Sequence, residues 1–371
     1  MINPAEKRQF ILYDYLQVAG GAERLTQTLA EALPDFQMVV SQIYPDYRHL
    51  ADTYSGAPLI LSKGIDHLLG RIPAAILNFS LRTQFLCDAD TVLYSGFYAP
   101  LAVRHQQRGC RIYYCHTPPR YAFDLKQKYL GRLRPSLRPG FRAFTHWIKN
   151  RYLTSIHKMD RVIANSDNVR ARLLNVAGID AEVVHPPIDT DRFCWLGQDN
   201  YYVSTARLES NKRVDLIVEA FQRMPDQRLI VLSGGSALKR LKTRAGRMSN
   251  IHFTGWQTDE QLRRWIGNAI ATLYIPVNED FGMSPVESMA AGKPVIGVAE
   301  GGLLETILDG QTGILLPTEP TIDHIITAVR QLTAHRALAM RQGCKARARL
   351  FSRDIFIDRM RAILKGDDFH Q

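Results

Sequence analysis

A chain of 371 residues, 46% of them apolar, is too long for one ordinary hydrophobic core and suits two domains. It has no apolar run of the roughly 18 residues that span a bilayer, and its first eight residues lack a signal peptide's apolar block, so we expect a cytoplasmic protein. The five cysteines show no metal-ligand spacing, and their odd number argues against a disulfide framework. The net charge of +11 indicates an anionic partner.

The first half of the chain alternates apolar, strand-like runs with amphipathic stretches, which is typical of a parallel sheet covered by helices. Gly20 and Gly21 follow the first strand and precede a helix, so backbone N–H groups there could approach a phosphate closely. An ordinary tight turn is the alternative explanation. The expected strands are 10–15, 37–43, 91–95, 111–115 and 161–165, and Ser166 is expected to cap a helix that ends near Ala177.

His116 follows the expected strand 111–115, and two prolines fix the chain after it, so its imidazole is held at the carboxyl edge of the sheet. Residues 120–172 then contain thirteen Lys or Arg against three acids, with aromatic residues between them. Nucleic acid, an anionic membrane or a diphosphate substrate could bind such a surface, and a merely solvated face is the remaining alternative. The interleaved aromatics favour a membrane, and we expect no nucleic-acid partner.

The second half repeats the pattern, with strands at 201–205, 228–232, 251–253, 271–276, 295–298 and 313–316 and helices from Thr321 onward. The sequence therefore predicts an α/β fold of two doubly wound, Rossmann-like domains that face each other across a cleft. Its expected parts are an N-terminal domain over 1–190, a C-terminal domain over 191–350, and a last helix over 351–371 that packs back on the N-terminal domain. Ligands should bind beyond the carboxyl ends of the strands.

The stretch from Glu279 to Glu287 sets one carboxylate in a glycine-containing loop and another near the start of a predicted helix. Both acids could face one polyhydroxylated ligand. The alternative is structural: Ser284 as a cap, Pro285 as the first helical residue and Glu287 three residues after the cap would form a capping box.

Two basic residues and two Asp-x-Asp motifs are relevant to how a ligand would be bound. Arg207 and Lys212 flank a loop between a strand and a helix, where they could hold a diphosphate and neutralise its charge as it leaves. Solvated surface cations are the alternative. Two Asp-x-Asp strings, at 88–90 and 189–191, are interpreted as turns, so cations and a helix dipole, with no metal ion, are expected to stabilise the leaving group.

Together these residues resemble the retaining, sugar-nucleotide-dependent glycosyltransferases of family 4, which have the two-domain GT-B fold. The resemblance rests on Glu279 and Glu287 around Phe281-Gly282, on the 206–208 loop ending in Lys212, and on the glycines at 20–21 and 234–235. The segment 115–121 is also similar to a bacterial subgroup that builds polysaccharides and lipopolysaccharide, often from GDP-mannose.

The resemblance implies a role for each matching residue. Arg207 and Lys212 would bind the donor diphosphate, Glu287 the ribose hydroxyls, and Glu279 the transferred sugar. The remaining implied donor contacts are the backbones of Phe281, Gly282 and Met283 near the sugar, Gly20 and Gly21 near the phosphates, His116 over the sugar, and Gly235 and Trp256 near the base.

Asp280 and the pair Ser284-Pro285 depart from the family pattern beside the sugar, so they leave the donor open between GDP-mannose, UDP-glucose and other nucleotide sugars. The resemblance implies hexosyl transfer with retained configuration to a glycan or a lipid-diphosphate-linked glycan, by a protein peripheral on the inner face of the membrane. The alternatives are a nucleotide-sugar-binding protein without transferase activity and a nucleic-acid-binding protein that uses the basic face.

Overall fold

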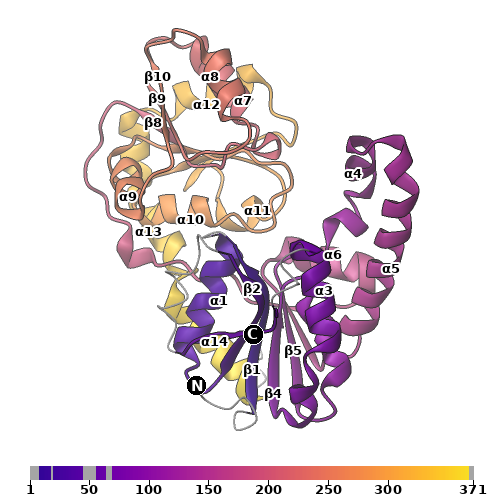
Figure 1. The fold of residues 1–371 in the computed structure, drawn as a ribbon. Coiled ribbons are helices and arrows are strands. Elements are labelled where there is room, and N and C mark those ends of the chain that lie inside the picture. The colour runs from indigo at the N-terminus through magenta and orange to yellow at the C-terminus, as the bar shows by residue number, and fades with distance from the viewer. Residues whose placement is uncertain (1–7, 18–19, 45–55, 64–68, 367–371) are drawn as a thin grey trace. The chain divides into compact units, whose positions relative to one another are not determined.

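The computed structural model describes residues 8–17, 20–44, 56–63 and 69–366, and the chain divides into two compact units (Figure 1). Unit 1 contains Met1–His185 and Ile357–Gln371, and unit 2 contains Pro186–Phe356. The division after His185 lies five residues before the predicted boundary between residues 190 and 191. Among the described residues, no helix has both the length and the apolar composition needed to cross a bilayer.

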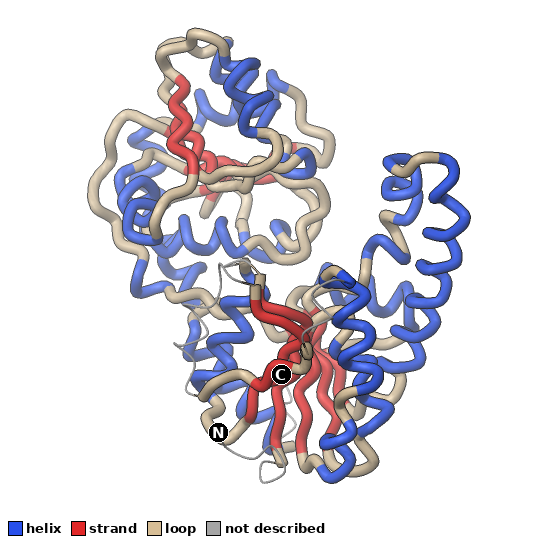
Figure 2. The backbone as a smooth tube through the Cα atoms, in the orientation of Figure 1, coloured by secondary structure: helices blue, strands red, loops and turns tan. Residues whose placement is uncertain are grey.

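Unit 1 is built on a seven-stranded sheet in which every neighbouring pair is parallel (Figure 2). The strand order is β3 (Leu59–Ile60), β2 (Gln37–Ile43), β1 (Gln9–Leu16), β4 (Thr91–Ser95), β5 (Cys110–Cys115), β6 (Arg161–Ala164) and β7 (Glu182–Val183). Its helices are α1 (Gly21–Ala32), α3 (Arg71–Leu81), α4 (Lys126–Arg132), α5 (Arg138–Ile156), α6 (Asp167–Ala177) and the last helix of the chain, α14 (Arg353–Lys365).

Local sequence explains how several of these elements begin and end. The Ser166 hydroxyl accepts a hydrogen bond from the Val169 N–H at 3.1 Å and caps α6 as predicted, and Gly178 ends the helix with a φ of 67°. At the end of the chain, Arg359 and Arg361 of α14 donate to the backbone carbonyls of Val183 and Ala32, at 3.1 and 3.0 Å. The second half of α14 therefore belongs to unit 1.

Unit 2 contains a six-stranded sheet that is also parallel throughout. The strand order is β10 (Ile251–Gly255), β9 (Leu229–Leu232), β8 (Tyr202–Ser204), β11 (Thr272–Leu273), β12 (Val295–Val298) and β13 (Gly313–Leu316). Its helices are α7 (Val214–Gln222), α8 (Leu238–Ala245), α9 (Asp259–Asn268), α10 (Met283–Ala290), α11 (Leu303–Thr306), α12 (Ile322–Gln331) and α13 (Ala334–Arg349).

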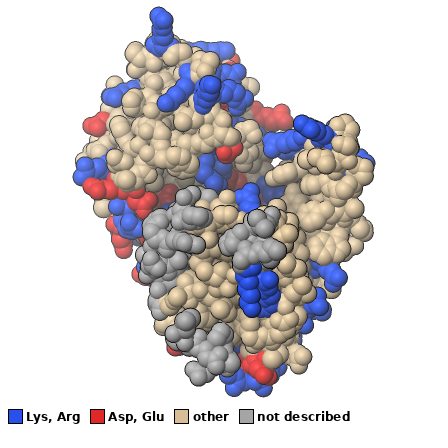
Figure 3. Space-filling view, viewed as in Figure 1, with Lys and Arg blue, Asp and Glu red and all other residues tan. Residues whose placement is uncertain are grey.

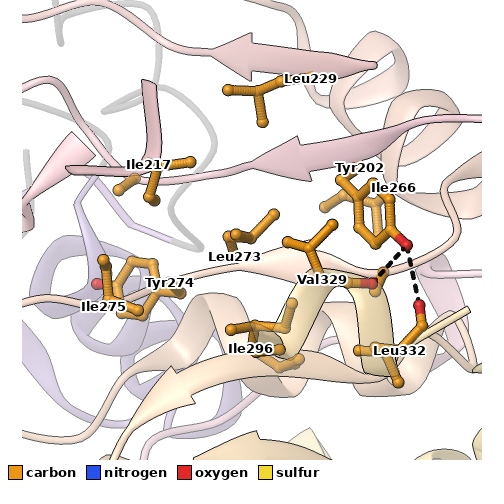
Figure 4. Packing of buried hydrophobic residues seen from close by; sticks show 14 of the residues in the cluster. Tyr202, Ile217, Leu229, Ile266, Leu273, Tyr274, Ile275, Ile296, Val329 and Leu332 are labelled. Carbon is orange, nitrogen blue, oxygen red and sulfur yellow. Dashed lines mark hydrogen bonds between the residues drawn. The ribbon is translucent and has the colours of Figure 1, made fainter. Parts of the chain in front are cut away.

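The core of unit 2 holds a buried tyrosine that joins the sheet to a helix end. Tyr202 of β8 donates its hydroxyl to the carbonyls of Val329 and Leu332, at 3.1 and 2.9 Å (Figure 4). Carbonyls in the last turn of a helix have no partner within the helix. The tyrosine therefore satisfies the end of α12 while its ring packs against Phe221 in the core.

Both sheets reverse their strand order at one point. In unit 1 the chain leaves β1 on one side and returns on the other with β4, and in unit 2 β8 and β11 have the same relation. Loops diverge at such a switch point, and ligands of doubly wound sheets bind there, beyond the carboxyl ends of the strands. The fold therefore directs attention to the loops that follow β1 and β4 in unit 1 and β8 and β11 in unit 2.

Candidate functional site

A lysine and a glutamate form a close ion pair at the switch point of unit 2. Lys212 ends the 3₁₀ helix Ser210–Lys212 after β8, and its Nζ lies 2.6 Å from Oε2 of Glu279, in the loop after β11. The side chains are only 11% and 22% exposed, so water screens the pair weakly. The Val277 N–H donates to the Asn211 carbonyl at 2.8 Å and holds the two loops together.

The predicted strand 271–276 is shorter in the structure. Only Thr272 and Leu273 form β11; the Tyr274 N–H still donates to the Ile296 carbonyl of β12 at 2.9 Å, and by Val277 the backbone pairs with the loop at Asn211 instead. Apolar residues continue to Pro276 and are buried, so their composition resembles that of a strand. Their burial reflects packing beneath the loop.

Tyr274 lies at the centre of this group of charges. Its hydroxyl accepts a hydrogen bond from Lys212 Nζ at 3.0 Å. Burial raises the pKa of Tyr274 well above its ordinary value, the charge of Glu279 and a hydrogen bond to it raise that pKa further, and Arg207 and Glu287 act in opposite directions. The tyrosine therefore stays protonated and contacts both members of the ion pair, although nothing in its sequence context marks it.

The start of α10 differs from the capping-box alternative, which is wrong. Gly282 is the N-cap, with a φ of +91°, and no side chain caps the helix. Because the helix begins one residue earlier than Ser284, at Met283, Glu287 lies in the second turn, too far along to close a box. Its side chain is buried at 4% exposure, which is unusual for a carboxylate and places it inside the unit's charged cluster.

A second glycine pair, Gly301-Gly302, supports the loop that carries Glu279. A Cβ at Gly301, where φ is +62°, would lie 2.4 Å from the Glu279 carbonyl oxygen, and a Cβ at Gly302 would lie 2.4 Å from the Cα of Phe281. The Gly302 N–H donates to the Glu279 carbonyl at 2.9 Å. This pair was not predicted from the sequence, although it has the same pattern as Gly20-Gly21, two glycines after a strand.

The loops after β8, β9 and β10 form a neighbouring group around an exposed tryptophan. The Leu208 N–H donates to the Gly234 carbonyl at 2.9 Å, and a Cβ at Gly235 would lie 2.5 Å from the Leu208 carbonyl oxygen. A Cβ at Gly234 would meet the Trp256 indole at 2.5 Å, and Trp256 is 67% exposed. A flat apolar ring is thus presented beside a closely packed backbone.

In unit 1, His116 lies directly after β5 at the carboxyl edge of the sheet, as predicted. Its Nε2 is 2.8 Å from the Ser95 hydroxyl, and its ring contacts those of Tyr13 and Tyr114. Burial lowers the pKa of His116 to about 4, so the imidazole is neutral at physiological pH. It can exchange hydrogen bonds with a ligand but carries no charge.

Asp14 of β1 also lies at this edge and was not predicted from the sequence. Its carboxylate accepts the backbone N–H groups of Phe97, Tyr98 and Ala99 at 2.6, 2.8 and 2.8 Å, which fixes the loop after β4. Burial raises its pKa to about 6, although these three hydrogen bonds act in the other direction. The sequence feature that could have indicated Asp14 is a single acidic residue inside an otherwise apolar strand.

The predicted residues thus fall into separate groups. Lys212 and Glu279 are in direct contact, and the charges of Arg207 and Glu287 are near enough to influence the pKa of Tyr274. The other predicted residues of unit 2 lie in two loops: Phe281, Gly282 and Met283 in one, and Gly235 and Trp256 in the other. In unit 1, Gly20 is the N-cap of α1, Gly21 its first residue, and His116 lies at the sheet edge.

Comparison with known proteins identifies two families along the chain. Residues 19–192 match the family described as Glycosyltransferase Family 4, and residues 191–350 match Glycosyl transferases group 1. The mouse alpha-1,3/1,6-mannosyltransferase ALG2 is 26% identical in an alignment that covers 92% of each chain. D-inositol 3-phosphate glycosyltransferase of Mycobacteroides abscessus is 29% identical, but the alignment covers 45% of this chain and only 43% of that protein.

Solved structures share the fold. Anabaena Alr3699/HepE in complex with UDP matches with a TM-score of 0.75 and 16% identity over 96% of this chain and 100% of that one. WaaG, a glycosyltransferase involved in lipopolysaccharide biosynthesis, matches with a TM-score of 0.73 and 16% identity over 96% and 99%. The two parallel-sheet α/β domains therefore have the architecture found in these proteins, as the sequence predicted.

Proposed function

Since this chain belongs to family 4 of the glycosyltransferases, we propose that it moves a hexosyl group from a nucleotide sugar to a glycan or a lipid-linked glycan, with retention of the anomeric configuration. The observation that carries the proposal is the Lys212–Glu279 ion pair at the switch point of unit 2. A nucleotide sugar offers an anionic diphosphate next to a hydroxyl-rich sugar. The pair presents one partner for each.

Donor binding would divide the ion pair between two parts of one ligand. Lys212, together with the exposed guanidinium of Arg207, would take the diphosphate, and Glu279 would then accept hydrogen bonds from sugar hydroxyls. Tyr274 would keep its contact with Lys212 and hold the ammonium group in place. The pair, 2.6 Å apart in the free protein, must open to admit the ligand, and its two charges then serve adjacent parts of the donor.

The neighbouring loops would bind the rest of the donor. The buried Glu287 would accept the ribose hydroxyls, the exposed ring of Trp256 would lie near the base beside Gly235, and the backbone of Phe281, Gly282 and Met283 would line the sugar. For unit 1, the roles of Gly20 and Gly21 toward the phosphates and of the neutral His116 toward the sugar stay predictions from the family resemblance.

In the proposed reaction, the acceptor oxygen bonds to the anomeric carbon as the bond to the diphosphate oxygen breaks. The acceptor attacks from the face that the nucleotide leaves, and its proton passes to the departing diphosphate. Lys212 and Arg207 would stabilise the charge that develops on the diphosphate. We propose that these two cations make a metal ion unnecessary.

The names of the relatives limit the choice of donor and acceptor. ALG2 is a mannosyltransferase, Alr3699/HepE has also been solved with UDP-glucose, and WaaG acts in lipopolysaccharide biosynthesis. We therefore propose GDP-mannose or UDP-glucose as the donor and a lipid-diphosphate-linked glycan as the acceptor. The basic and aromatic surface at 120–172 would bring the enzyme to the anionic inner face of the membrane.

A thermal-shift screen with GDP, UDP, GDP-mannose and UDP-glucose tests the donor, because a ligand that binds only the folded protein raises Tm. Replacing Lys212 with Ala should abolish the shift and lower donor turnover by about 100-fold or more. Lys239→Ala, an exposed lysine of α8, is the matched control and should change neither. Near-normal turnover in Lys212→Ala would contradict the proposal. Donor binding without transfer to any glycan acceptor would favour a binding protein.

A further inference from the structure

Unit 1 contains a cavity of about 230 Å³ away from the carboxyl edge of its sheet, between α3, α5 and the 3₁₀ helix Ala99–His105. Pockets for drug-sized ligands measure about 300–1,000 Å³, so this cavity suits a narrower group. Its walls are mainly apolar, and the apolar side chains are Ile76, Leu77, Leu81, Leu101, Val103 and Trp147.

The cavity reaches the surface beside two large apolar side chains. Leu81 is 51% exposed and Trp147 is 42% exposed, and both also line the cavity. Apolar surface that is contiguous with an apolar cavity is typical of a site for an apolar partner, whereas single exposed apolar residues are common and carry no such meaning. A straight alkyl chain fits a cavity of this size and composition.

Three cations stand at the same cavity. Arg104, Arg151 and Lys158 line it, all three side chains are exposed, and none forms an ion pair with a described residue. The Arg151 guanidinium lies 5.9 Å from the centre of the Trp147 ring, so cation and aromatic ring are neighbours in the cavity lining. An apolar interior with a rim of free positive charge is complementary to an alkyl chain that carries an anionic head.

The surrounding surface indicates where such a ligand would come from. Helix α5 lies within the basic segment 120–172, and in Figure 3 Lys and Arg side chains appear along the margins of the region formed by α4 and α5. Trp147 is on this helix, and tryptophan is enriched at the boundary between lipid and water. An amphiphile dissolved in a membrane would meet the basic surface and the cavity together.

We propose that this cavity binds one acyl chain of an anionic phospholipid, with the lipid phosphate held by Arg104, Arg151 and Lys158. The inference rests on the membrane association proposed above for residues 120–172. It adds a defined lipid site to a diffuse electrostatic attraction. Such a site would make binding depend on the chain as well as on the charge of the lipid.

Trp147 provides the readout, since it is the only tryptophan in the sequence of unit 1. The probe is a short-chain phosphatidylglycerol with brominated acyl chains, used below its micelle concentration with the full-length protein. The lipid should quench Trp147 fluorescence saturably, and the quenching should vanish in Trp147→Phe. Inorganic phosphate should neither quench nor compete at equal concentration, since it lacks the chain.

Two substitutions separate the chain from the charge. Leu81→Glu places a carboxylate in the mouth of the cavity and should abolish quenching, and its half-exposed position spares the fold. Arg151→Glu should weaken binding at least about fivefold, whereas Arg142→Glu, on the same helix but outside the cavity, should change it less. Unchanged thermal melts would show that the variants are folded.

Several results would overturn the inference. These are absence of quenching in the unmodified protein, equal quenching in Leu81→Glu, and equal weakening by Arg151→Glu and Arg142→Glu. Vesicle flotation on phosphatidylglycerol-containing vesicles distinguishes the underlying proposal. Flotation without quenching would support membrane association and contradict the lipid site. If the unmodified protein does not float with the vesicles, the proposed membrane association is wrong, whatever the transferase activity.

Discussion

Replacing Glu279 with Gln should tighten the binding of a nucleoside diphosphate while it slows sugar transfer. In the free protein, Lys212 Nζ is occupied by the Glu279 carboxylate at 2.6 Å. A diphosphate without a sugar must compete with that carboxylate and gains nothing from it. The neutral amide keeps the shape of the side chain but releases the ammonium group for the phosphate.

The expected size of the effect follows from the burial of the pair. Fully exposed ion pairs contribute about 0.2–1 kcal/mol, and hydrogen bonds to charged groups contribute about 1.5–3 kcal/mol. With side chains 11% and 22% exposed, Lys212 and Glu279 lie between these cases, so about 1 kcal/mol is reasonable. This corresponds to about fivefold tighter binding. Turnover should fall about 10- to 100-fold, because the sugar loses a charged hydrogen-bond partner.

Isothermal titration with UDP and GDP measures the first effect, and donor consumption with acceptor measures the second. Glu260→Gln is the matched control, since Glu260 of α9 pairs with Arg264 at 2.8 Å on the exposed surface, and neither quantity should change. Nucleoside diphosphate binding that is equal or weaker in Glu279→Gln would refute the reasoning. It would mean that Lys212 does not bind the phosphates.

Three further predictions concern packing and protonation. Gly301→Ala should lower stability and turnover much more than Gly310→Ala does. Both glycines have positive φ, but only at Gly301 would the new Cβ meet a backbone oxygen, at 2.4 Å. Equal melting temperatures of the two variants would contradict this prediction. Burial of Lys293 lowers its pKa from 10.5 to about 7, so between those pH values the unfolded chain binds more protons than the folded one. The free energy of unfolding should therefore rise with pH in that interval, by up to about 1.4 kcal/mol per pH unit. Urea titrations that compare the unmodified protein with Lys293→Met measure this slope. His116, with its pKa lowered from 6.5 to about 4, should cost stability as pH falls through that interval, and His116→Gln should remove this component; an imidazole NMR titration near pH 6.5 would show the assignment to be wrong.

Much of the fold could be predicted because its strands are buried on both faces. The expected strands 37–43, 91–95, 295–298 and 313–316 coincide with β2, β4, β12 and β13. Parallel strands covered by helices carry nearly unbroken apolar runs, and polar or glycine-containing turns delimit them. The signal is local, so the sequence is sufficient.

The features that could not be predicted depend on contacts between distant residues. The early start of α10 reflects the conformation of Gly282, and the segment after β11 is fixed by the hydrogen bond from Val277 to Asn211, in the loop after β8. Tyr274 is one aromatic residue in an apolar run until the fold brings Lys212 to its hydroxyl. Local propensity predicted a capped helix and a six-residue strand, and tertiary packing overrode both.

Backbone strain marks the same edge of unit 2 independently of its charges. Among the described residues, three non-glycine residues have positive φ: Arg213 at 51°, Ser233 at 76° and Asn278 at 42°. They follow β8, β9 and β11, beside the loops that carry Lys212, Gly235 and Glu279. Such conformations cost about 1–3 kcal/mol each and persist only where the surroundings hold them. Arg213 is held by an ion pair with Glu300 at 3.3 Å, next to the glycine pair that supports the Glu279 loop. Because these three residues lie in the loops that follow β8, β9 and β11 at one edge of the sheet, we interpret the strain as a sign of loops that keep a fixed shape at a binding surface.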